Sequence, residues 1–165
     1  MGFFQESICD CCYCPMQFAL KQFEGEVVFI STLLDPNIEL NLSSVEDFIV
    51  FGTMNGDRAC VPVSEIFSFA SMITKPPAGL VKPIQKSVKG KCGCIEDPMT
   101  NKFNVGDIVS INGSPPLQVN AVGEGIVVVN LLDSPIHTII SICNVVFSVE
   151  FLPPTTTNQA INTQS

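Results

Sequence analysis

An internal repeat is the feature that most limits the folds open to this chain. The segment Gly25-Glu-Val-Val-Phe-Ile-Ser has a similar counterpart further along, Gly106-Asp-Ile-Val-Ser-Ile-Asn. Two further pairs of segments match in the same order and at nearly the same spacing. They begin at Ser44 and Ala121, and at Val63 and Ile142. Three ordered matches at nearly constant spacing indicate one structural unit used twice, although two β segments rich in Val and Ile would also look alike.

The first unit has the pattern of a short helix followed by five short strands. Pro15 suits the first turn of a helix, and apolar residues recur at helical spacing from there to Phe23. Asn55-Gly56 is a strong hairpin signal. Pro62 indicates that its strand is an edge or is bulged. The five strands are expected at residues 26–32, 38–43, 48–53, 59–63 and 66–71.

We therefore expect an all-β protein of two modules. A short helix before five bent strands resembles a small Sm-like or SH3-like barrel, and closure of that kind hides sheet edges. The alternative is a single β-sandwich built from all ten strands. The expected divisions are a Cys-rich N-terminal arm (1–14), β module 1 (15–73), a basic connector rich in Pro, Gly and Lys (74–102), β module 2 (103–152) and a disordered or docking tail (153–165).

Composition favours a chain whose surface is partly buried against other copies of itself. Hydrophobic residues make up 46% of the chain and charged residues 15%, whereas soluble monomers usually carry a larger charged fraction. A compact β protein with apolar loops would show the same values. The net charge is −8 and Arg58 is the only arginine, so no nucleic-acid partner is expected, since such proteins cluster Lys and Arg.

The positive charge is concentrated between the two units. Residues 74–102 hold six of the eight basic residues and carry a net +4, while residues 1–73 carry −8 and residues 103–165 carry −4. This connector is expected to be a solvated linker, or else to lie across an acidic module of its own chain or a neighbour's.

Four of the eight cysteines fall within six residues, in Cys9-Asp-Cys-Cys-Tyr-Cys14, and Cys92-Gly-Cys94 adds two more in the connector. One interpretation is a tetrahedral zinc site, for which the thiolates of Cys9, Cys12, Cys92 and Cys94 are the candidate ligands. Zinc sites usually pair two C-x-x-C segments, and the second segment here is C-x-C. Thioredoxin-like chemistry would place C-x-x-C before a helix within a βαβ pattern, and no such pattern follows.

The remaining interpretation is disulfide crosslinking between subunits. Cysteines in terminal segments can reach neighbouring molecules, and lysines around Cys92 and Cys94 favour the thiolate, which is the reactive form. The proposed donors of intersubunit bonds are Cys9, Cys11, Cys12 and Cys14, and the proposed acceptors are Cys92 and Cys94. Cys60 and Cys143 fall within expected strands and are interpreted as small buried apolar residues.

No catalytic constellation is visible, and we expect no enzyme. His137 is the only histidine, so a nucleophile–histidine pair would need a distant Cys or Ser brought close by folding. The adjacent carboxylates Glu46-Asp47 and Glu96-Asp97 make no natural dyad, because neighbours on a strand point to opposite faces.

The segment Cys-Asp-Cys-Cys-Tyr-Cys-Pro-Met-Gln from Cys9, with the short helix and the Gly25 and Ser44 segments behind it, resembles cysteine-rich structural proteins of the spore surface of endospore-forming bacilli. The resemblance covers about residues 9–70. It implies a coat or exosporium protein that is made in the mother cell and oxidised later. The connector and the second module depart from that pattern.

These observations predict a structural, self-assembling protein that forms a disulfide-crosslinked spore-surface layer or filament. The expected partners are other copies of itself and, as a second class, other spore-surface proteins. The alternative is a small zinc-binding module. The start of the chain lacks the basic segment and long apolar run of a secretory signal, and no stretch approaches the roughly 18 apolar residues of a spanning helix. We therefore expect synthesis in the cytosol, no membrane partner and no cofactor outside the zinc alternative.

Overall fold

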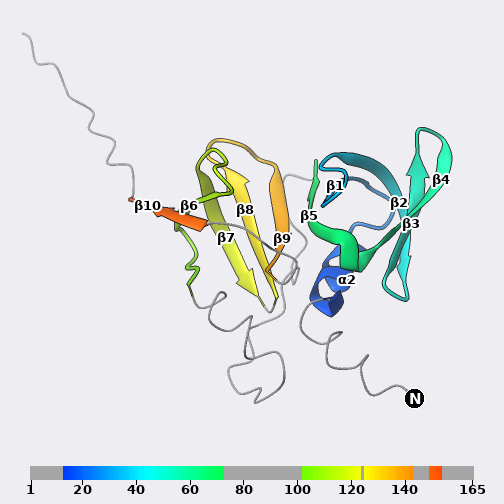
Figure 1. Cartoon of the computed structure of the whole chain (residues 1–165), viewed down its shortest axis with the longest axis horizontal. Helices are drawn as coiled ribbons and strands as arrows, with labels where there is room; N and C mark the ends of the chain where they lie inside the picture. Colours follow the sequence, from blue (N-terminus) through cyan, green and yellow to red (C-terminus); the bar gives the residue numbers. More distant parts are fainter. Residues whose placement is uncertain (1–12, 73–101, 124, 143–148, 154–165) are drawn as a thin grey trace, which may run out of the picture.

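A computed structural model describes residues 13–72, 102–123, 125–142 and 149–153 (Figure 1). Within these ranges, one α-helix precedes ten strands. The elements are α2 (Cys14–Lys21), β1 (Val27–Thr32), β2 (Ile38–Glu46), β3 (Ile49–Met54), β4 (Asp57–Pro62), a 3-10 turn η2 (Val63–Glu65), β5 (Ile66–Ser71), β6 (Ile108–Ile111), β7 (Leu117–Gly123), β8 (Ile126–Leu131), β9 (His137–Ser141) and β10 (Val149–Leu152). We call α2 and β1–β5 the first half of the chain, and β6–β10 the second half.

Local sequence explains the helix and the strands of the first half. Pro15 lies in the first turn of α2, and the helix buries one face through Met16, Ala19 and Leu20. Asn55 and Gly56 both have positive φ, 54° and 90°, as a tight hairpin turn between paired strands requires. The predicted helix and the predicted β3–β4 hairpin are therefore confirmed.

All ten strands belong to one antiparallel sheet, in the order β10-β6-β7-β8-β9-β5-β1-β2-β3-β4. The prediction of an all-β fold after a short helix is confirmed, but the prediction of two closed barrels is wrong. Closing the first half would require β5 to pair with β4. Instead β5 pairs with β9 of the second half (Figure 1), so β4 and β10 are the two edges of the described sheet. An edge position for β4 agrees with Pro62 at its end.

The two halves of the sheet carry the same register. Asn41 of β2 lies opposite Thr53 of β3, and at the equivalent place in the second half Gln118 of β7 lies opposite Asn130 of β8. A bulge interrupts β2 and β7 at the same point in this register. The strand pairings also equate β4 with β9, and β5 with β10. The internal repeat predicted from the sequence is thus present in the fold.

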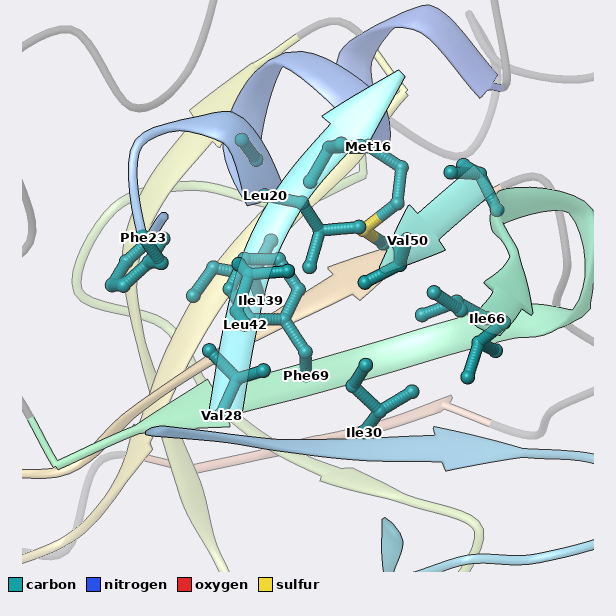
Figure 2. Close-up of a cluster of buried hydrophobic side chains, with 14 of the residues drawn as sticks. Met16, Leu20, Phe23, Val28, Ile30, Leu42, Val50, Ile66, Phe69 and Ile139 are labelled. Atoms are coloured by element: carbon teal, nitrogen blue, oxygen red, sulfur yellow. The ribbon is translucent and has the colours of Figure 1, made fainter. Parts of the chain in front are cut away.

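Two hydrophobic cores lie against this sheet. The first core joins α2 and β1–β5 to three residues of the second half, and Figure 2 shows Ile139 of β9 among side chains from α2, β1 and β5. The three residues are Ile126, Val128 and Ile139. The second core contains their neighbours Val127, Val129 and Ile140. Since successive strand residues point to opposite faces, β8 and β9 contribute one face to each core.

Candidate assembly surface

The clustered cysteines fall mainly outside the described residues. These are Cys9, Cys11, Cys12, Cys92 and Cys94, which include all four candidate zinc ligands, together with Cys143. Only Cys14 and Cys60 can be placed. Within the described ranges, no group of three or more His, Cys, Asp or Glu side chains lies close enough to hold a metal ion.

Cys14 is the first residue of α2 and is half-buried. It is disulfide-bonded. Its neighbours in sequence fix its position, because Tyr13 and Met16 both pack against the first core. A neighbouring molecule would therefore reach the Cys14 sulfur by exchange with this disulfide rather than by oxidation of a free thiol.

Cys60 carries a free thiol and is exposed. The prediction that it is a small buried residue is wrong. It lies on β4 directly opposite Phe51 of β3, and β4 is the edge of the described sheet. Its neighbour Val61 points to the first core, so Cys60 points to the other face, where α2 and β5 do not cover it.

This thiol is part of an exposed apolar strip, which consists of Ile49 and Phe51 of β3 and Cys60 of β4. We call these three residues the β3–β4 outer face. Phe51 is 39% exposed and Ile49 is half-buried. Sequence reasoning missed this surface. The signal was present, because Ile49 and Phe51 alternate with the core residue Val50, and a strand that is apolar on both faces is expected to be buried on both.

A polar cluster lies on the second half. The Asn120 side-chain amide donates a hydrogen bond to the Asn130 side-chain carbonyl, and its nitrogen lies 3.3 Å from Nδ1 of His137. Asn130 in turn donates to the Ser134 carbonyl at 3.0 Å. These hydrogen bonds connect β7 and β8 to His137 of β9 and to the turn between β8 and β9, and so stabilise the packing of these strands.

Comparisons of the chain with protein-family models, with curated proteins and with solved structures find no match. In the part of the chain that the structure describes, no helix is long and apolar enough to cross a membrane.

Proposed function

We propose that the protein is a structural subunit that assembles with copies of itself and is then crosslinked by disulfides into a layer or filament. One observation carries this proposal: the edge of the described sheet at β4 bears an exposed apolar strip, the β3–β4 outer face. Exposed sheet edges pair with other chains unless they are protected. Charge gives little protection here, because Arg58 and Asp57 are the only charged residues of β4.

Other large apolar side chains are exposed along the described surface. Phe151 of the edge strand β10 is 45% exposed, and the side chains of Leu33 and Leu34 in the turn after β1 are largely exposed to solvent. Scattered apolar residues are normal on a protein surface. Exposed apolar side chains near both edges of the described sheet, Phe51 beside β4 and Phe151 on β10, in a chain with only 15% charged residues, favour a protein that works as an assembly.

Cysteines supply the covalent step of the proposal. Cys9, Cys11, Cys12 and Cys14 act as donors to a neighbour's Cys92 and Cys94. In exchange, a neighbour's thiolate attacks the Cys14 sulfur, a new S–S bond forms, and the sulfur previously bonded to Cys14 leaves as a thiolate, so no net oxidant is needed. Two free thiols instead need an oxidant such as dioxygen, which takes up the two electrons and two protons released and becomes hydrogen peroxide. The spore surface is the proposed location on the strength of the resemblance of residues 9–70. Assembly in a reducing cell followed by oxidation on release fits cysteines that begin in a cytosol.

The test is oxidation of the purified chain at high concentration, followed by reducing and non-reducing gels and negative-stain microscopy. We expect a ladder of oligomers that collapses with reductant, and ordered fibres or sheets on the grid. Replacing Cys9, Cys11, Cys12 and Cys14 together with Ser should remove the ladder. A Cys60→Ser variant is the matched control and should keep it. A monomer in both lanes with an empty grid would overturn the proposal.

The zinc alternative stays a prediction, since its four cysteines lie outside the described residues. It is separated by metal analysis of the purified protein. Zinc bound at one equivalent, and lost when Cys9, Cys12, Cys92 and Cys94 become Ser, would favour that module over the crosslinked assembly.

A further inference from the structure

The junction between the two halves is the starting point. β5 and β9 pair antiparallel, with Phe69 opposite Ile139 and Ala70 opposite Thr138. This junction buries one face of β8 and β9 in the first core: Ile126, Val128 and Ile139 are each 1% exposed. The first half thus extends its own core across β9 onto side chains supplied by the second half (Figure 2).

The repeat shows that each edge of the described sheet carries a strand equivalent to one side of the β5–β9 junction: β4 is equivalent to β9, and β10 is equivalent to β5. By the common register, Ile126, Val128 and Ile139 of the second half correspond to Ile49, Phe51 and Cys60 of the first. The latter three are the β3–β4 outer face, which is open. At the opposite end of the sheet, β10 corresponds to β5, and in the described sheet it pairs only with β6.

We propose that β10 of one copy pairs antiparallel with β4 of the next copy, repeating the β5–β9 junction between molecules. This rests on the proposed function and names its non-covalent interface. Transferring the register of β5–β9 places Val149 opposite Cys60, Glu150 opposite Ala59 and Phe151 opposite Arg58 of the neighbour. The β3–β4 outer face then extends the second core of the adjacent molecule, as Val128 and Ile139 extend the first.

The side chains at these positions suit such a contact. Val149 already packs against the second core and would meet the apolar strip of Phe51 and Cys60. Phe151, which contacts Phe103 at a ring-centroid distance of 5.7 Å, would lie opposite the guanidinium of Arg58, a favourable cation–π pairing. Pro62 corresponds to Ser141, which lies beyond the last β5–β9 pair, so its missing amide hydrogen interrupts none of the proposed pairs.

Because β10 and β4 are different surfaces, the interface is head-to-tail. Such an interface closes into a ring if the rotation between copies permits, and otherwise continues as a filament. Every subunit adds ten strands to one continuous sheet, which leaves no unpaired β4 or β10 except at the ends of the assembly.

Sedimentation velocity of the full-length protein in reductant, over a range of concentrations, tests this interface without disulfides. The wild-type protein should associate beyond a dimer as concentration rises. Phe51→Glu should weaken the association constant by at least about tenfold, since docking would bury a charge against apolar groups. Phe18→Glu is the matched control: Phe18 of α2 is 38% exposed, close to the 39% of Phe51, and the same charge there should leave association unchanged.

A wild-type protein that stays monomeric at several hundred micromolar in reductant would overturn the inference. So would equal association of the wild type and Phe51→Glu, with circular dichroism showing both folded. Ladders under oxidation, combined with a reduced monomer, would leave the crosslinked assembly standing and remove only this interface. Association that needs no oxidation, with no ladder afterwards, would support the interface and contradict the proposed crosslinks.

The register has its own test. In a chain where every cysteine except Cys60 is Ser, Val149→Cys should form a disulfide with Cys60 of a neighbour on mild oxidation, because facing strand residues have Cα atoms about 4.5–5.5 Å apart and disulfides span about 4.4–6.8 Å. Glu150→Cys is the control, since its side chain points to the opposite face. Equal crosslinking of the two variants would contradict the register. The sedimentation experiment uses the chain with its native cysteines, so its outcome does not depend on the Cys-to-Ser replacements made here.

Discussion

At the scale of single residues, Gly52 is fixed by the close approach of β2. A Cβ atom at this position would collide with the Asn41 carbonyl oxygen and would lie 2.8 Å from Cγ of Leu40, and the first of these is backbone that cannot swing aside. We expect Gly52→Ala to lower the free energy of unfolding by about 1–3 kcal/mol, the usual cost of overpacking. Urea denaturation measures this. Thr53→Ala, on the next residue of β3, is the control and should cost clearly less.

Ser141 presents the opposite case, a polar atom that the fold leaves unsatisfied. Its side chain is fully buried, and its hydroxyl has no hydrogen-bond partner in the described structure. Removing an unsatisfied buried hydroxyl relieves its desolvation cost, so Ser141→Ala should be neutral or stabilise by about 1 kcal/mol. Ser110→Ala should instead destabilise, because the Ser110 hydroxyl donates to the Ser114 carbonyl at 2.8 Å. Thermal melts of the two variants that move in the same direction would contradict this reasoning.

At the scale of elements, α2 does more than cover the first core. The Gln17 side-chain carbonyl accepts a hydrogen bond of 2.7 Å from the backbone amide of Phe48, in the β2–β3 turn, where Phe48 has a φ of 61°. A bulky residue rarely adopts that conformation, so the helix helps to hold it. Gln17→Ala leaves the amide unsatisfied and should cost about 1–2 kcal/mol of unfolding free energy in a urea titration. Gln22→Ala, at the half-buried position just after the same helix, removes a longer hydrogen bond of 3.5 Å to the Phe18 carbonyl and should cost much less. Equal losses would show that the Gln17–Phe48 hydrogen bond is not what matters.

Element positions could be predicted from the sequence because their signals are local. β5 was expected at its observed bounds, and Asn55-Gly56 placed the hairpin between β3 and β4. Pairing between distant strands is not local. β5 pairs with β9, which belongs to the other half of the chain, and no turn chemistry or alternation specifies that partner, so the barrels predicted from local pattern did not form.

The candidate site was predictable to a smaller degree. The exposure of Cys60 could not be predicted from its strand, because a cysteine is compatible with either face of a sheet. The face is decided by strand pairing: Val61 lies opposite the core residue Val50, so its neighbour Cys60 points to the other face, opposite Phe51. The roles of the clustered cysteines, apart from the placement of Cys14, stay predictions, since those residues lie outside the described ranges.

At the scale of the whole molecule, the shared core predicts one cooperative unfolding unit. Ile139 belongs to the second half in sequence but is buried in the first core beside Phe69. Tyr13, the only tyrosine in a chain without tryptophan, packs against that same core. Its fluorescence therefore reports on the first half, while far-ultraviolet circular dichroism reports on the strands of both.

We expect Ile139→Ala to lower the free energy of unfolding by about 2–4 kcal/mol, as for other large-to-small core changes, and to shift the Tyr13 and circular dichroism transitions together. A residue of the second half would thus destabilise a probe in the first. Leu131→Ala, at a 45% exposed position of β8, should leave both transitions nearly in place. If Ile139→Ala moved only the circular dichroism transition and left the Tyr13 transition in place, the two halves would unfold independently. The β5–β9 junction would then be too weak to couple the halves of one molecule. A contact of the same kind would also be too weak to join separate molecules.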